Sequence, residues 1–105
     1  FIKPEQENIR QVFADRWAEN DQRAYLNAMR ALVGWSVSAR VGSIRVPTLV
    51  IAADQDYSPL AAKQEYTAKI PNARLEVISD SRHATPVERP QEFNLVLQKF
   101  LAEHK

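Results

Sequence analysis

One short stretch constrains the fold more than any other: the apolar run from Thr48 to Ala53, which Asp54 and Asp56 follow. The run is rich in β-branched residues and does not alternate with polar ones, which favours a strand covered on both faces by helices. Pro47 fits the start of such a strand, because proline cannot donate a hydrogen bond to a neighbouring strand. The stretch therefore predicts a parallel α/β sheet with carboxylates at its carboxyl edge.

The sequence after this strand predicts one strand–helix–strand unit. Ser58 and Pro59 are typical of the N-cap and first turn of a helix, which must end by Ile70 because Pro71 follows. Arg74–Ser79 alternates in polarity and predicts the next strand, so the whole forms a right-handed βαβ unit. Two parallel strands do not make a stable sheet alone. We expect the missing strands to come from an N-terminal part or from another copy of the chain.

Helices are predicted on both sides of this unit. The first begins near Pro4, the second is capped by Asn20 or Asp21 and ends between Gly34 and Gly42, and the last opens at Pro90. Their apolar stripes follow the helical spacing i, i+3, i+4, i+7. The stripes comprise Ile9, Val12, Phe13 and Trp17; Tyr25, Ala28, Met29, Leu32 and Val33; and Phe93, Val96, Leu97, Phe100 and Leu101.

Composition excludes several classes of function. A chain of 105 residues makes at most one small domain, and a net charge of +1 with interspersed charges gives no basic patch for nucleic acid. The chain has no cysteine, no apolar stretch long enough for a membrane span and no signal-peptide pattern at Phe1. We therefore expect a cytoplasmic protein with no nucleic-acid or membrane partner. Because it does not begin with methionine, we expect a processed or truncated chain.

The candidate chemistry is an acid and a base at one edge of the sheet. Asp56 follows the first predicted strand by three residues, and His83 follows the second by four. The carboxyl ends of parallel strands meet at one edge, so these two side chains are expected to touch. A carboxylate bonded to one imidazole nitrogen fixes the tautomer and stabilises the charge when the other nitrogen takes a proton. Asp54 is better explained as a turn or capping residue.

Several linked motifs in the right order resemble the C-terminal third of an α/β-hydrolase. They are Val46–Pro59, Ile70–Ile78, His83, Glu88–Asn94 and Phe100–Leu101, so the resemblance covers about residues 44–102. It implies that Asp56 is the catalytic acid and His83 the catalytic histidine. It further implies that residues 1–42 are cap or lid helices and residues 43–105 the C-terminal part of the core. No cofactor and no metal are implied.

This sequence departs from the family pattern at two positions and lacks one motif. Ala53 stands where glycine is usual before the acid, and Arg82 stands where a small residue commonly precedes the histidine. The family carries its nucleophile on Gly-x-Ser-x-Gly, upstream of the acid. The nearest approach, Gly34-Trp-Ser36-Val-Ser38, lacks the second glycine and follows a helix rather than a strand. No nucleophile is therefore assigned in this chain.

The resemblance implies a parent enzyme that attacks an ester, lactone, carbon–carbon or related bond in a small-molecule substrate. His83 would act as general base and then general acid, Asp56 would orient it, and an upstream Ser or Asp would be the nucleophile. The 105-residue chain is expected to be inactive by itself.

Other interpretations of the same residues remain open. Asp54-Gln-Asp56-Tyr-Ser58 also resembles the first motif of haloacid-dehalogenase-type phosphatases, but no acidic pair after a strand follows it. A non-catalytic interaction module, whose unpaired strand edges meet across a dimer axis, is the main alternative. Trp17 and Trp35 are candidates for a substrate pocket or for the core, and His104 for a cation at a helix C-terminus.

Overall fold

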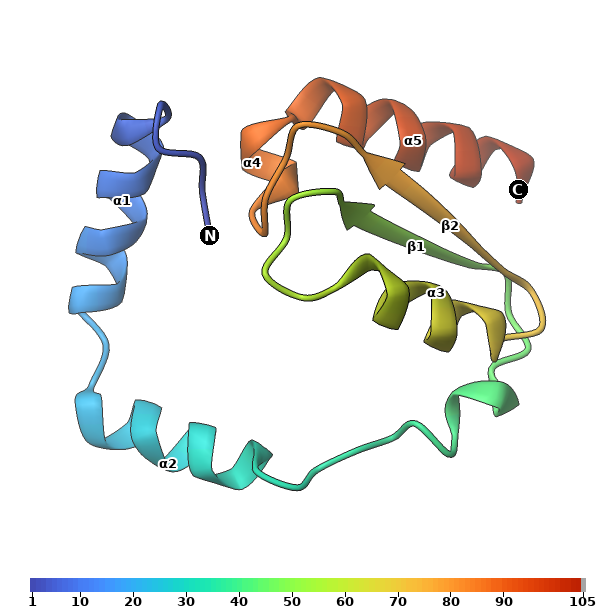
Figure 1. Ribbon diagram of the computed structural model, residues 1–105, viewed down its shortest axis with the longest axis horizontal. Helices are drawn as coiled ribbons and strands as arrows, with labels where there is room; N and C mark the ends of the chain where they lie inside the picture. Colours follow the sequence, from blue (N-terminus) through green and yellow to red (C-terminus); the bar gives the residue numbers. More distant parts are fainter. Residues whose placement is uncertain (105) are drawn as a thin grey trace.

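Two parallel strands, with helices beside them, form one part of the molecule, and the amino-terminal helices lie apart from it (Figure 1). The structure, a computed structural model, describes residues 1–104. In chain order the elements are α1 (Glu7–Ala18), α2 (Gln22–Leu32), the 3₁₀ turn η1 (Val41–Ser43), β1 (Thr48–Ala53), α3 (Leu60–Ala68), β2 (Ala73–Ile78), α4 (Thr85–Glu88) and α5 (Pro90–Glu103). No helix among these residues is both long and apolar enough to cross a membrane.

The strands β1 and β2 pair in parallel, which confirms the predicted α/β class. Thr48 lies opposite Ala73 and Ala53 lies opposite Ile78, so both strands end at the same edge. Helix α3 connects the two strands, and α3 and α5 lie on opposite sides of the sheet (Figure 1). This register delivers the loops after both strands to one place.

Burial of the sheet is concentrated at that carboxyl edge. Ala52, Ala53 and Ile78 are each no more than 4% exposed, whereas Thr48–Ile51 are only partly buried. The expected burial of the first strand along its whole length is therefore wrong for these four residues. The physical reason is that β1 has one strand neighbour among the described residues, and the two helices cover it incompletely.

Helices α1 and α2 form an arm that curves away from the sheet (Figure 1). The radius of gyration is 16.2 Å, larger than the roughly 13 Å of a typical domain of this length. The apolar stripe of α2 lies uncovered, with Tyr25 55%, Leu32 57% and Val33 83% exposed. The sequence therefore predicts the helix and its amphipathic pattern correctly, but this pattern has no partner in the described chain.

The observed ends of the helices decide three predictions about caps and first turns. Asp21 caps α2, because its carboxylate accepts a hydrogen bond of 2.6 Å from the Ala24 amide. Pro4 lies in a turn before α1 and not in its first turn, since the helix begins at Glu7. Ser58 is not the N-cap of α3: the cap position is Pro59, and the Ser58 hydroxyl instead donates to Asp56.

A buried carboxylate joins the amino-terminal segment to the loop after β2. Glu88, on the short helix α4 that the sequence did not predict, is 6% exposed. One of its oxygens accepts a 2.9 Å bond from the Lys3 amide, and the other accepts a 2.9 Å bond from the Arg82 amide. The second oxygen also accepts from the hydroxyl of Ser81, which is fully buried. Glu88 thus satisfies backbone groups from two separate segments.

We expect Glu88→Ala to lower the free energy of unfolding by about 1–3 kcal/mol, because it leaves buried amides without an acceptor. Urea unfolding followed by circular dichroism measures the change. Glu65→Ala is the matched control, since the Glu65 side chain is 71% exposed and should cost less than about 0.5 kcal/mol. Equal stability of the two variants would contradict the assigned role of Glu88.

Candidate functional site

Asp56 and His83 meet at the carboxyl edge of the sheet. Asp56 lies in the loop between β1 and α3, and His83 lies in the loop between β2 and α4. The Nδ1 atom of His83 is 3.0 Å from Oδ1 of Asp56, a hydrogen-bond distance. The structure therefore brings the two predicted site residues together, and the parallel register of β1 and β2 is the reason.

The two members of this pair have different environments. The Asp56 side chain is 8% exposed, whereas the His83 side chain is 37% exposed. The second imidazole nitrogen, Nε2, is 3.1 Å from the hydroxyl of Tyr57, whose ring lies 4.4 Å from the imidazole between centroids. On another side the Phe1 ring lies 4.8 Å from the imidazole. A buried acid thus holds a partly exposed base between two aromatic rings.

The far oxygen of Asp56 has its own partners. Its Oδ2 accepts a 2.9 Å bond from the Ser58 hydroxyl and a 2.8 Å bond from the ammonium of Lys63. Burial by itself would raise the pKa of Asp56, but hydrogen bonds from Lys63, Ser58 and His83, together with the Lys63 charge, hold that pKa far below its usual value. Asp56 is therefore a carboxylate at neutral pH, as a partner for an imidazolium must be.

Asp54 has a structural role, as the sequence predicted. Its carboxylate accepts bonds of 3.0 Å from the Asp80 amide and 3.1 Å from the Ser81 amide. The Asp80 amide, together with that of Ser81, outweighs desolvation and lowers the pKa of Asp54 from its ordinary value. Asp80 has a φ of 55°, a left-handed conformation that aspartate tolerates better than most residues. Asp54 thus fixes the turn that leads from β2 to His83.

The backbone of the histidine loop is also held from the other end of the chain. The carbonyl of Phe1 accepts hydrogen bonds from the amides of His83 at 3.0 Å and Ala84 at 3.4 Å. Together with Glu88 and Asp54, this contact fixes the loop on three sides. Glu88 belongs to one of the motifs identified in the sequence, but its role was missed, because nothing in its local pattern marks it as a buried acceptor.

Sequence reasoning also missed Tyr57 and Lys63. The one feature of the sequence that could have pointed to Tyr57 as a site residue is its position directly after Asp56. Lys63 is a single charged residue after Leu60-Ala-Ala at the start of α3, an apolar turn that indicates a helix face packed on the sheet. A lysine on such a face, in the first turn of the helix that follows the acid, is a signal that the pattern did offer.

Other candidates from the sequence lie apart from any such cluster. The hydroxyls of Ser36 and Ser38 are exposed and hydrogen bond to each other at 3.0 Å. His104 is the C-cap of α5, and its Nδ1 lies 2.8 Å from the carbonyl of Phe100. Within residues 1–104, no three acidic, histidine or cysteine side chains gather in a way that could hold a metal ion.

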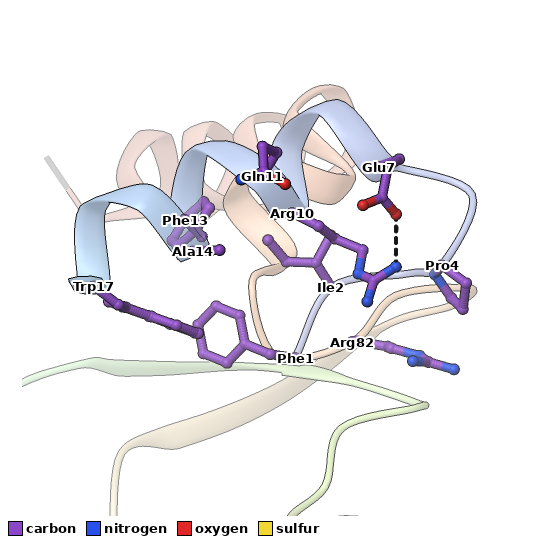
Figure 2. A pocket seen from close by; sticks show the side chains of 10 residues that line it. All are labelled: Phe1, Ile2, Pro4, Glu7, Arg10, Gln11, Phe13, Ala14, Trp17 and Arg82. Atoms are coloured by element: carbon purple, nitrogen blue, oxygen red, sulfur yellow. Dashed lines mark hydrogen bonds and ion pairs between the residues drawn. The ribbon is translucent and has the colours of Figure 1, made fainter.

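A cavity lined in part by aromatic rings lies next to Phe1, the residue whose ring contacts His83. It has a volume of about 440 Å³, and its lining includes Phe1, Phe13, Trp17, Arg10 and Arg82. Figure 2 shows Phe1 and Trp17 side by side at one end and the two arginines toward the other end, where Arg10 pairs with Glu7. Phe1 contacts both the Trp17 ring at 4.9 Å and the imidazole, and so connects the cavity to His83. Trp35 is 65% exposed and does not line it.

Comparison with known proteins gives a consistent set of relatives, although no protein-family model matches the sequence. The chain is 30% identical to 3-oxoadipate enol-lactonase 1 of Acinetobacter baylyi, over 90% of its own length and 36% of that protein. It is 31% identical to a protein assigned as the carbamate hydrolase RutD of Stutzerimonas stutzeri, over 86% of its own length and 38% of that protein. The chain thus spans little more than a third of either relative.

A solved structure agrees with these relatives. The crystal structure of a predicted CIB-like hydrolase from Thermoplasma acidophilum superimposes with a TM-score of 0.60 at 32% identity. The match covers 62% of this chain and 32% of that one. The relatives are α/β-hydrolase family members, and this chain is similar to them in sequence and in fold over about a third of their length.

Proposed function

We propose that this chain supplies the acid and the base of a hydrolase whose nucleophile lies outside it. His83 is the general base and later the general acid, and Asp56 orients it. The observation that carries this proposal is the 3.0 Å contact between Nδ1 of His83 and the buried carboxylate of Asp56. Such a contact leaves Nε2 as the nitrogen that exchanges protons with reacting groups.

The chemistry follows from that arrangement. If the nucleophile is a serine, its hydroxyl gives a proton to Nε2 of His83 while its oxygen attacks the carbonyl carbon of the substrate. The imidazolium then gives this proton to the leaving group, and a water molecule repeats the sequence on the acyl intermediate. If the nucleophile is an aspartate, His83 activates the water of the second step. In both cases a group must approach Nε2 where the Tyr57 hydroxyl now lies.

The substrate class that we propose is a small molecule with an ester, lactone or related bond. Two relatives are described as an enol-lactonase and a carbamate hydrolase, and both names denote cleavage at a carbonyl carbon attached to oxygen or nitrogen. The cavity next to Phe1 is of the size that holds small ligands. The chemistry of the pair itself needs no cofactor and no metal.

A reconstituted enzyme tests the roles of the pair. We expect His83→Ala and Asp56→Asn, in a protein that joins this chain to a nucleophile-bearing N-terminal part, to reduce kcat by about 10³–10⁴-fold. Hydrolysis of an activated ester and of a lactone measures the loss. His104→Ala and Asp15→Asn are matched controls at exposed positions and should retain activity. Full activity in either site variant would remove that residue from the mechanism.

The isolated chain provides a second test. Because no nucleophile is assigned in it, we expect the 105-residue protein to hydrolyse an activated ester no faster than its His83→Ala variant does. Stopped-flow absorbance with p-nitrophenyl acetate makes the comparison. Turnover that depends on His83 would show that the nucleophile lies in this chain after all, and would contradict the proposal.

The uncovered stripe of α2 favours one alternative, a non-catalytic module that associates with itself. Leu26 is 45%, Met29 46% and Leu32 57% exposed on this helix, more apolar surface than a helix in water usually leaves uncovered. The sheet also has open edges, to which another strand can add. The hydrolase proposal assigns the stripe to the rest of the same polypeptide, and the alternative assigns it to a second copy.

Light scattering separates the two assignments. We expect the isolated chain to self-associate and Met29→Lys to weaken this association by placing a charge on the stripe. We also expect addition of the N-terminal part to replace the homo-oligomer by a one-to-one complex. A homo-oligomer that persists in the presence of the N-terminal part would favour the interaction module.

A further inference from the structure

A buried lysine completes the environment of Asp56. Lys63 is 9% exposed, and its ammonium donates three hydrogen bonds of 2.8 Å. The acceptors are the carboxylate of Asp56, the hydroxyl of Ser58 and the carbonyl of Ser58. All three donor positions of the ammonium are therefore used within one loop. A lysine this deeply buried is rare unless it is paired.

The geometry divides the carboxylate of Asp56 between two partners. Lys63 and Ser58 bind Oδ2, whereas His83 binds Oδ1. With one oxygen held by a fixed cation, the carboxylate cannot rotate away from the imidazole without breaking the bonds to α3. The lysine also supplies a positive charge to Asp56 even while His83 is neutral, so the buried carboxylate does not depend on an imidazolium for its charge balance.

We propose that Lys63 is a positioning residue of the Asp56–His83 pair, which fixes the carboxylate against the imidazole and offsets part of its negative charge. This inference rests on the proposed function. It differs from a purely structural role, in which Lys63 would only close the Ser58 turn. In that case, removal of the lysine charge would leave the midpoint of the His83 titration unchanged.

Other charged and titratable groups around the imidazole are few. The Tyr57 hydroxyl faces Nε2, Arg82 is the preceding residue, and Phe1 contributes its uncharged ring. Asp56 is the acidic partner that bonds to the ring, and Lys63 binds the other oxygen of the same carboxylate. The substitutions below leave all the other groups in place.

The test is an NMR titration of the His83 ring in the 105-residue chain. We expect Lys63→Met to move the midpoint of the His83 titration upward by about one pH unit, because an uncompensated carboxylate stabilises the imidazolium. Lys63→Arg, which keeps the charge, should return the midpoint toward that of the unsubstituted chain. An unchanged midpoint in Lys63→Met overturns the inference, and so does an equal upward shift in Lys63→Arg.

A second background separates this inference from the proposed function. In Asp56→Asn the midpoint should fall, because the imidazolium loses its anionic partner. If Asp56→Asn leaves the midpoint unchanged, the pairing itself fails and both ideas fall with it. If Asp56→Asn lowers it but Lys63→Met does not raise it, only the role of Lys63 fails.

A measurement on the unsubstituted chain covers the case in which Lys63→Met does not fold. An ammonium held by three hydrogen bonds exchanges its protons slowly, so the Lys63 Nζ protons should give a resolved signal at neutral pH and low temperature. Exposed Lys69, which pairs with Glu65 on the surface of the same helix, is the matched control and should give none. Loss of the Lys63 signal in the unsubstituted chain would overturn the inference.

Discussion

The parallel pairing of β1 and β2 is the constraint on which the site depends. Their register places Ala53 opposite Ile78, so the two following loops leave the sheet at the same level. A shift of this register would move Asp56 away from His83, although each residue would keep its place in its own loop. The contact between acid and base is therefore a property of the sheet, and the loops only refine it.

The loops are fixed by charged and polar groups more than by apolar packing. Asp54 binds two amides of the histidine loop, and Glu88 binds amides from that loop and from the amino-terminal segment. Both carboxylates are bonded by backbone groups that would otherwise lack acceptors. Such networks are stable only when every member is satisfied, which is why a single substitution in them is expected to be costly. The buried ammonium of Lys63 and the buried carboxylate of Asp56 satisfy each other in the same way.

The arm formed by α1 and α2 contrasts with this ordered edge. Both helices carry apolar stripes and Asp21 caps α2, but neither helix has a buried residue. Helices of this length are marginal in water unless an apolar face is covered. The chain matches little more than a third of its enol-lactonase relative. The uncovered stripe, the half-buried strand β1 and the open sheet edges are all surfaces that further polypeptide would cover.

Local sequence by itself determined the elements and the candidate pair. The unbroken apolar run 48–53, Pro71 after Ile70 and Pro90 before an apolar stripe fix the strand, a helix end and a helix start, because each acts through its own backbone or near neighbours. The motif order around Asp56 and His83 likewise indicated the family. The sequence did not give the helix α4, and it misplaced the N-cap at Ser58, whose hydroxyl has a stronger partner in Asp56.

Only the tertiary structure decided how the pair is held. Lys63, Tyr57, Glu88 and the carbonyl of Phe1 all act on this site, and all four lie on segments other than the loop that carries the residue they bind. Contacts between distant segments depend on how helices pack on the sheet, which no local pattern encodes. The division of the chain into cap helices (residues 1–42) and the C-terminal part of the core (residues 43–105) stays a prediction. The surfaces that a cap would contact are not covered within this chain.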